Sequence, residues 1–63
     1  MDKITGYELV TYDDDDFSRL NTEIFINLET AKKMKENYIK RDNDKGDWGR
    51  YYYAIHNVNI FLN

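Results

Sequence analysis

The chain has 63 residues, a formal net charge of −3 and no cysteine. A chain of this length buries only about 60% of its unfolded surface, so we expect a small core whose stability is supplemented from outside, for example by a partner. The absence of cysteine excludes disulfides and thiolate zinc sites, and the single histidine leaves carboxylates as the only dense metal ligands. No segment is apolar enough for a signal peptide or a membrane span, which predicts a cytoplasmic protein without a membrane partner.

Charge and residue usage are both uneven along the chain. Residues 1–29 carry eight acidic and two basic side chains, a net charge of −6, whereas residues 30–63 carry seven basic and four acidic ones, a net charge of +3. The abundance of Asn, Lys, Ile, Tyr and Asp, together with the absence of proline, is typical of an AT-rich coding sequence. This usage suggests a low-GC bacterium or its phage, in which case the host cytoplasm is the expected location.

Two strands are expected before the helix. Residues 4–12 alternate as a strand does, but both faces carry apolar side chains, so the pattern leaves the core side open. The four aspartates 13–16 cannot continue this strand, because Asp is depleted in strands and adjacent charges repel one another. We therefore expect a hairpin turn that starts at these aspartates, a loop as far as Asn21, and a second strand at about residues 22–26.

Residues 22–41 contain the strongest helix signal. Asn27 is suited to cap the helix, because its side-chain oxygen can accept a free backbone N–H of the first turn. At 100° per residue the apolar side chains fall into one stripe about 140° wide. The stripe consists of Leu28, Ala31, Met34, Tyr38 and Ile39.

A polar loop and a long strand follow the helix. Residues 42–47 are rich in turn formers and are expected to form the loop, and residues 50–62 form the strand. The apolar positions change parity near His56 and Asn57, which predicts a β-bulge or a sharp bend. The alternative is one regular strand that buries Tyr52, Ala54, His56, Val58, Ile60 and Leu62. The complete pattern predicts a single α+β domain, residues 1–63, of order β-β-α-β, with a three-stranded antiparallel sheet and one helix packed on a face.

Neither catalysis nor a metal or other cofactor is expected. A calcium loop beginning at Asp42 would place Gly46 at a ligand position and Tyr53 where the bidentate Glu belongs. His56 has no neighbouring Ser or Cys nucleophile pattern, and aspartates in an exposed turn lack the burial that separates the pKa values of an acid–base pair.

The expected function is therefore binding, and two surfaces compete for it. The first is acidic and would bind another protein, with carboxylates steering the encounter and aromatic rings anchoring it. Its residues are Asp13, Asp14, Asp15, Asp16, Phe17, Tyr51 and Tyr53. Small acidic cysteine-free chains are common among phage-encoded inhibitors that mimic DNA on nucleic-acid enzymes, which makes such an enzyme a candidate partner.

The alternative is a nucleic-acid-binding surface in which cations pair with phosphates while bases stack on aromatic rings. Its residues are Lys32, Lys33, Arg41, Arg50 and Trp48. The overall acidity and the lack of a nucleic-acid-binding motif weigh against it. A homodimer is also expected, because a three-stranded sheet has two open edges and the final strand is long and largely apolar.

Overall fold

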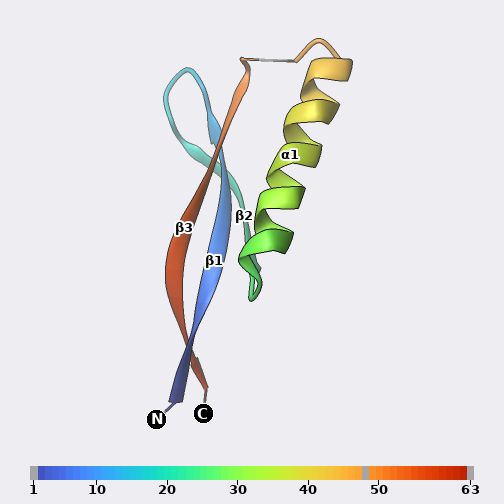
Figure 1. Ribbon diagram of the computed structural model, residues 1–63. Coiled ribbons are helices and arrows are strands. Elements are labelled where there is room, and N and C mark those ends of the chain that lie inside the picture. Colours follow the sequence, from blue (N-terminus) through green and yellow to red (C-terminus); the bar gives the residue numbers. More distant parts are fainter. Residues whose placement is uncertain (1, 48, 63) are drawn as a thin grey trace.

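The computed structural model describes residues 2–47 and 49–62, which form three strands and one helix (Figure 1). The elements are β1 (Asp2–Asp13), β2 (Arg19–Phe25), α1 (Leu28–Asp44) and β3 (Tyr51–Leu62). The sheet is antiparallel with strand order β2-β1-β3, so β1 lies in the centre. This architecture confirms the expected β-β-α-β fold with one helix on a face.

The first hairpin is tighter than the sequence suggests. β2 begins at Arg19 and pairs with β1 from Tyr12–Arg19 to Tyr7–Phe25, with one irregularity between Thr11 and Tyr12. The turn therefore occupies only residues 14–18, and the expected loop as far as Asn21 is wrong. The expectation that none of the four aspartates continues the first strand is also wrong for Asp13, which is the last residue of β1 and pairs with Tyr51. The irregularity leaves Leu20 as an extra residue on β2, as in a β-bulge. On either side of Leu20, the polar residues Arg19 and Asn21 still pair with β1.

β3 pairs with β1 without interruption, from Asp2–Leu62 to Asp13–Tyr51, so the expected bulge near residues 56 and 57 is wrong. The alternative expectation of one regular strand is confirmed, but its burial of the Tyr52 face is wrong, because Tyr52 is 50% exposed and the neighbouring Tyr53 is 5% exposed. The apolar positions of β3 change parity near residue 56 because α1 covers only the first half of this strand, where Tyr53 and Ile55 face the helix. Beyond that point both faces of the strand are partly open.

Asn27 caps α1 as expected, since its side-chain oxygen accepts the N–H groups of Glu29 (2.8 Å) and Thr30 (3.4 Å). The helix extends past the expected loop boundary to Asp44. It ends before Gly46, whose φ of +76° suits the left-handed residue that commonly follows a helix. The buried stripe also differs from the expected one: Ile39 is 41% exposed, and Asp42 is buried in its place.

The core contains Leu9 and Val10, which are adjacent on the central strand and point to opposite faces of the sheet. Leu9 is covered by the helix. Val10 lies on the other face, where Tyr12 forms a hydrogen bond with Nε2 of His56 (3.1 Å). His56 lies opposite Glu8, four residues along β1 from Tyr12, so the tyrosine ring must lie lengthwise over Val10. The two faces are thus buried by different means, a helix on one and surface side chains on the other.

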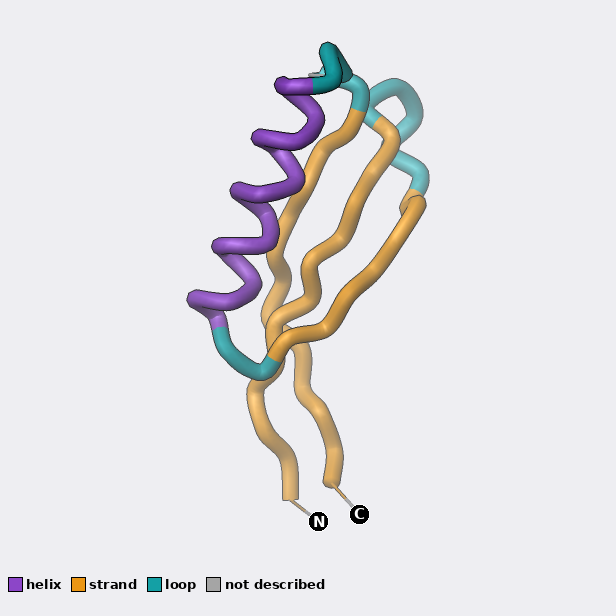
Figure 2. Tube along the Cα trace, turned by 90° about the vertical axis from the view of Figure 1, so that its right-hand side faces the viewer, coloured by secondary structure: helices purple, strands orange, loops and turns teal. Residues whose placement is uncertain are grey.

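The lower parts of β1 and β3 extend past the end of β2 as a two-stranded arm, residues 2–6 and 58–62 (Figure 2). The arm contributes to the elongated shape of the molecule, whose principal extents are 45 × 24 × 13 Å. Gly6 has a role within the arm: a Cβ at this position would lie 2.5 Å from Cδ1 of Ile60. The side chain of Ile60 can therefore lie against the β1 backbone only because residue 6 is glycine.

Candidate functional site

The four aspartates 13–16, of which Asp13 ends β1 and the other three begin the turn, form an internally braced segment that we call the acidic turn. The Asp13 carboxylate accepts the N–H of Asp15 (2.8 Å), and the Asp16 carboxylate accepts the N–H of Ser18 (2.9 Å). Hydrogen bonds from Ser18 to the exposed carboxyl of Asp16 lower the pKa of that group. In the described part of the chain, no hydrogen bond or ion pair engages the carboxylates of Asp14 and Asp15, which are exposed.

Phe17 follows the aspartates in an unusual backbone conformation. Its φ is +57°, in the left-handed region, which costs a side-chain-bearing residue about 1–2 kcal/mol. The ring is 61% exposed and meets Tyr52 edge-on, with ring centroids 6.2 Å apart. The turn thus holds a large aromatic side chain at the surface in a conformation that glycine would adopt without strain.

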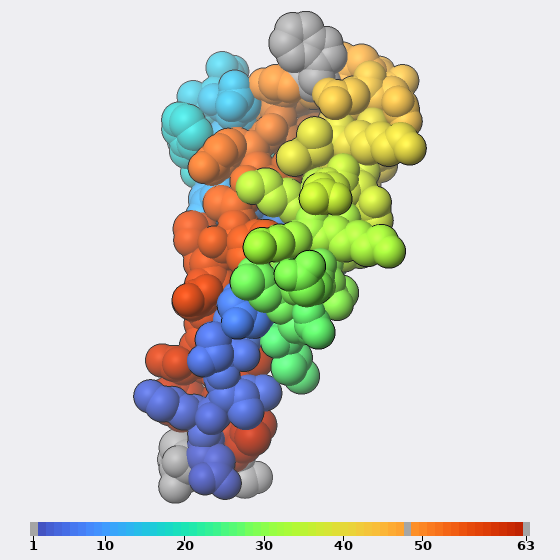
Figure 3. All heavy atoms as spheres, viewed as in Figure 1, coloured from blue at the N-terminus to red at the C-terminus, as the bar shows by residue number. Residues whose placement is uncertain are grey.

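The pairing of Asp13 with Tyr51 brings the acidic turn beside the loop between α1 and β3 (Figure 3). The contact is fixed by the N–H of Asp14, which donates to the carbonyl oxygen of Arg50 (3.1 Å). Between the two segments lies a groove with a volume of about 670 Å³. It is lined by Asp13, Asp14, Asp15, Leu20, Gly46, Asp47, Gly49, Arg50 and Tyr51.

Negative charge dominates this groove, which has four carboxylates against a single guanidinium. Arg50 is 68% exposed and reaches Asp47 at 3.9 Å, the longest of the three ion pairs found among the described residues. Exposed ion pairs of this kind contribute little to stability, and the two side chains of the pair remain available to other charges. Together with Phe17 and Leu20, both largely exposed, the groove forms a surface to which we refer as the acidic end.

The structure separates the two tyrosines that the sequence groups together. Tyr51 is half-buried and lines the groove. Tyr53 lies in the core, where its hydroxyl donates a hydrogen bond to the buried carboxylate of Asp42. Burial, followed by the hydrogen bond to Asp42, raises the pKa of Tyr53 to about 12. Tyr53 is therefore part of the core and contributes no contact surface to the acidic end.

Sequence reasoning missed Asp42 because the composition of residues 42–47 resembles a loop. A helical signal was nevertheless present: Asp42 follows Tyr38 by four residues and Ala31 by eleven, so all three lie on one face of a continued helix. An aspartate at the end of such a stripe points toward the sheet, where a tyrosine hydroxyl is a suitable donor.

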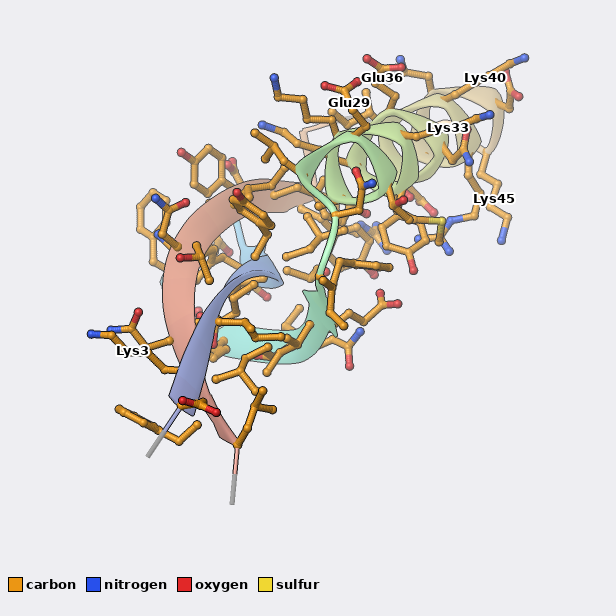
Figure 4. All side chains as sticks on the ribbon, turned by 60° about the horizontal axis from the view of Figure 1, so that its bottom comes forward. Lys3, Glu29, Lys33, Glu36, Lys40 and Lys45 are labelled. Atoms are coloured by element: carbon orange, nitrogen blue, oxygen red, sulfur yellow. The ribbon has the colours of Figure 1, made fainter. Side chains whose placement is uncertain are left out.

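The residues of the nucleic-acid alternative are dispersed. Lys32 and Lys33 are exposed near the start of α1, while Arg41 lies about 14 Å further along the helix, with its guanidinium 4.8 Å from the centre of the Tyr38 ring. Arg50 belongs to the acidic end, and Trp48 lies outside the described residues. Figure 4 shows Lys33, Glu36 and Lys40 projecting from the outer side of the helix, away from the sheet. Tyr51, Tyr52 and Tyr53 alternate between the two faces of the sheet, so these tyrosines form no common stacking platform beside the lysines.

Neither a metal site nor a membrane-spanning helix is found in the described part of the chain. Within residues 2–47 and 49–62, no three acidic or histidine side chains converge in a way that could hold a metal ion. None of the helical segments in the same residues is both long enough and apolar enough to cross a membrane.

Comparison of the chain with protein-family models, with curated proteins and with solved structures gave no match in any of the three.

Proposed function

We propose that this protein is a small non-enzymatic binding module that docks its acidic end onto a basic surface of another protein. The observation that carries the proposal is Phe17, a large exposed side chain that is held in a strained backbone conformation beside a run of carboxylates. Strain of this kind persists only where the surroundings enforce it, and it concentrates at functional sites.

The chemistry of the acidic end suits such a partner. Clustered carboxylates accelerate the encounter with a basic surface and disfavour acidic competitors, while aromatic side chains supply much of the binding energy at protein interfaces. The two types of group are close together in the chain, where Asp14 and Asp15 precede Phe17 and Leu20 follows it. The turn is braced before binding, so little ordering entropy is lost on docking.

The partner that best fits this surface is a nucleic-acid-binding protein whose basic groove normally holds phosphates. Consecutive aspartates present closely spaced negative charge in a fixed arrangement, and a groove that neutralises phosphates with Lys and Arg would accept them. In this proposal the protein acts as an inhibitor of the phage type, by competing with the nucleic acid for that groove.

A pull-down from a low-GC bacterial lysate, with and without nuclease, tests the proposal. We expect a protein to be captured equally in both samples and to be released when duplex DNA is added in excess. Capture that disappears after nuclease treatment would contradict the proposal and favour direct nucleic-acid binding through the basic residues. Capture that DNA does not release would exclude the inhibitory mechanism and leave the protein-binding function.

A further inference from the structure

In the arm, one edge of β1 is open along residues 2–6, and the open stretch ends where β2 begins to pair with β1. β1 pairs with β2 only from Tyr7 onward, so along residues 2–6 the edge of β1 that faces the β2 side has no partner in the described chain. Its other edge is paired with β3 throughout. A two-stranded ribbon is at best marginally stable in water, and a third strand beside it provides both backbone partners and apolar cover.

Large apolar side chains are exposed at the same end of the molecule. Ile26, which directly follows β2, is 69% exposed, and Phe61 and Leu62 are 60% and 47% exposed. On the face away from the helix, Ile4 pairs with Ile60 and both are only half-buried. No polar side-chain cover comparable to that over Val10 is found among the described residues of this face of the arm.

We propose that a second copy of this chain occupies the open edge, with residues 2–6 of the two copies paired antiparallel about a two-fold axis at Ile4. In such a two-fold dimer, two paired residues must have their side chains on the same face of the sheet. Because side chains alternate between the faces, the two residue numbers must both be odd or both be even, so their sum is even. In the Ile4–Ile4 register, five residues of one copy pair with five of the other. Pairing stops in both directions at Tyr7, whose edge is already taken by Phe25 of its own chain. The open edge is therefore complementary to itself.

Charge favours the same register. Asp2 and Lys3 are the only charged side chains on this edge. With Ile4 opposite Ile4, Asp2 lies opposite Gly6 and Lys3 opposite Thr5, so no like charges are directly opposed. A shift by one residue to the axis at Lys3 would place two lysines directly opposite each other, which is destabilising, and would shorten the pairing. A shift to Thr5 would collide with β2.

The dimer has a functional consequence that goes beyond the proposed function of a single chain. The acidic turn and the arm lie at opposite ends of each copy (Figure 1). Antiparallel overlap of the two arms therefore directs the two acidic ends away from each other, which gives a two-ended module. The assembly can then bridge two basic surfaces, or bind a two-fold partner with higher avidity.

The test uses charge at the symmetry axis. We expect the mass of the wild-type protein, measured by sedimentation equilibrium, to rise from monomer to dimer across the micromolar to millimolar range, because small interfaces are weak. The variants I4K and I4E should each associate at least tenfold more weakly, since residue 4 then opposes the same charge in the other copy. An equimolar mixture of I4K and I4E should recover a heterodimer. A monomeric wild type, or a mixture that stays monomeric, would overturn the proposal.

Two controls separate this register from other associations. The variant N57K adds a lysine at an exposed position of β3 opposite Tyr7, outside the paired residues 2–6, and should retain the dimer, with circular dichroism reporting whether the fold is intact. Because the chain has no cysteine, I4C should form an interchain disulfide on oxidation. K3C and T5C should form one chiefly when mixed, since Lys3 opposes Thr5. If K3C alone cross-links as efficiently as the mixture of K3C and T5C, the proposed pairing is contradicted. Association that depends instead on the outer edge of β3 would also contradict it.

Discussion

Asp42 and the aspartates of the acidic turn have opposite surroundings. Asp42 lies at the end of α1 with 5% of its surface exposed, and it accepts a hydrogen bond from the Tyr53 hydroxyl. Asp14 and Asp15 lie in the acidic turn, exposed to solvent. The first carboxylate joins the helix to the sheet, and the other two are free to meet a partner. Identical side chains in two polar segments thus serve stability in one region and, in our proposal, recognition in the other.

We expect the largest effect on the free energy of unfolding from a change at the buried Asp42. The substitution Asp42→Ala should lower the free energy of unfolding by about 3 kcal/mol, because it removes a charged hydrogen-bond acceptor and leaves the buried Tyr53 hydroxyl without a partner. A chain of this size has a total stability of roughly 3–9 kcal/mol, so the loss would remove between about a third and all of it. Asp44→Ala, in the same helical turn but exposed, is the matched control and should change stability by less than about 0.5 kcal/mol. Urea titration followed by circular dichroism measures both, and equal losses would contradict a special role for Asp42.

Alkaline pH should affect the same contact. The pKa of Tyr53 is about 12 in the folded chain, against an ordinary value of 10.0, so folding favours the protonated hydroxyl. This contribution is fully present below pH 10 and is lost as the pH rises toward 12, an expected decrease of about 2–3 kcal/mol. The decrease should be smaller by that amount in Tyr53→Phe, which has no group to ionise at this position. Parallel pH profiles for the two proteins would show that Tyr53 is not the responsible group.

A smaller effect is expected where the helix meets β2. The Tyr38 hydroxyl donates a hydrogen bond to the Glu23 carboxylate (2.5 Å), and this hydrogen bond raises the pKa of Tyr38. Tyr38→Phe should cost about 1 kcal/mol of unfolding free energy, because this pair is only partly buried. Tyr52→Phe, on the helix-free face, provides a comparison that should leave the free energy nearly unchanged. If both substitutions have the same cost in denaturant titrations, the Glu23 contact does not stabilise the fold.

The strained turn should show the least effect on stability. Phe17→Gly relieves a positive φ worth about 1–2 kcal/mol and adds unfolded-chain entropy worth roughly 0.5–1 kcal/mol. The free energy of unfolding should therefore stay constant or rise slightly, while binding to the captured partner should weaken. A loss of stability greater than about 1 kcal/mol would indicate that Phe17 serves the fold rather than recognition.

Local signals explain what the sequence could predict. The Asn27 cap, the helix and the order of elements depend on residues close together in the chain, and all three are confirmed. The start of β2 and the central place of β1 depend on pairing between distant residues, for which the chain offers no local pattern. The extra residue Leu20 also disturbs the alternation from which strands are recognised.

The acidic end was predictable only in part, for the same reason. The run of four aspartates marked the turn, but its contact with Arg50 exists because β1 pairs with β3 as far as Asp13 and Tyr51. Tyr53 was misplaced because neighbouring strand residues point to opposite faces, and parity alone cannot tell which face a helix covers. The sequence therefore identified the charges of the site without identifying the groove between them.

Charge reversal in the acidic turn tests the central claim most directly. In the variant D14K/D15K the turn keeps its bracing aspartates at 13 and 16, and E29K/E36K on α1 makes the same change in net charge away from the acidic end. We expect D14K/D15K to keep an unfolding free energy within about 0.5 kcal/mol of wild type and to lose binding to the captured partner in calorimetry. The control should still bind. Equal binding by D14K/D15K and wild type would contradict the assignment of the acidic end as the recognition surface.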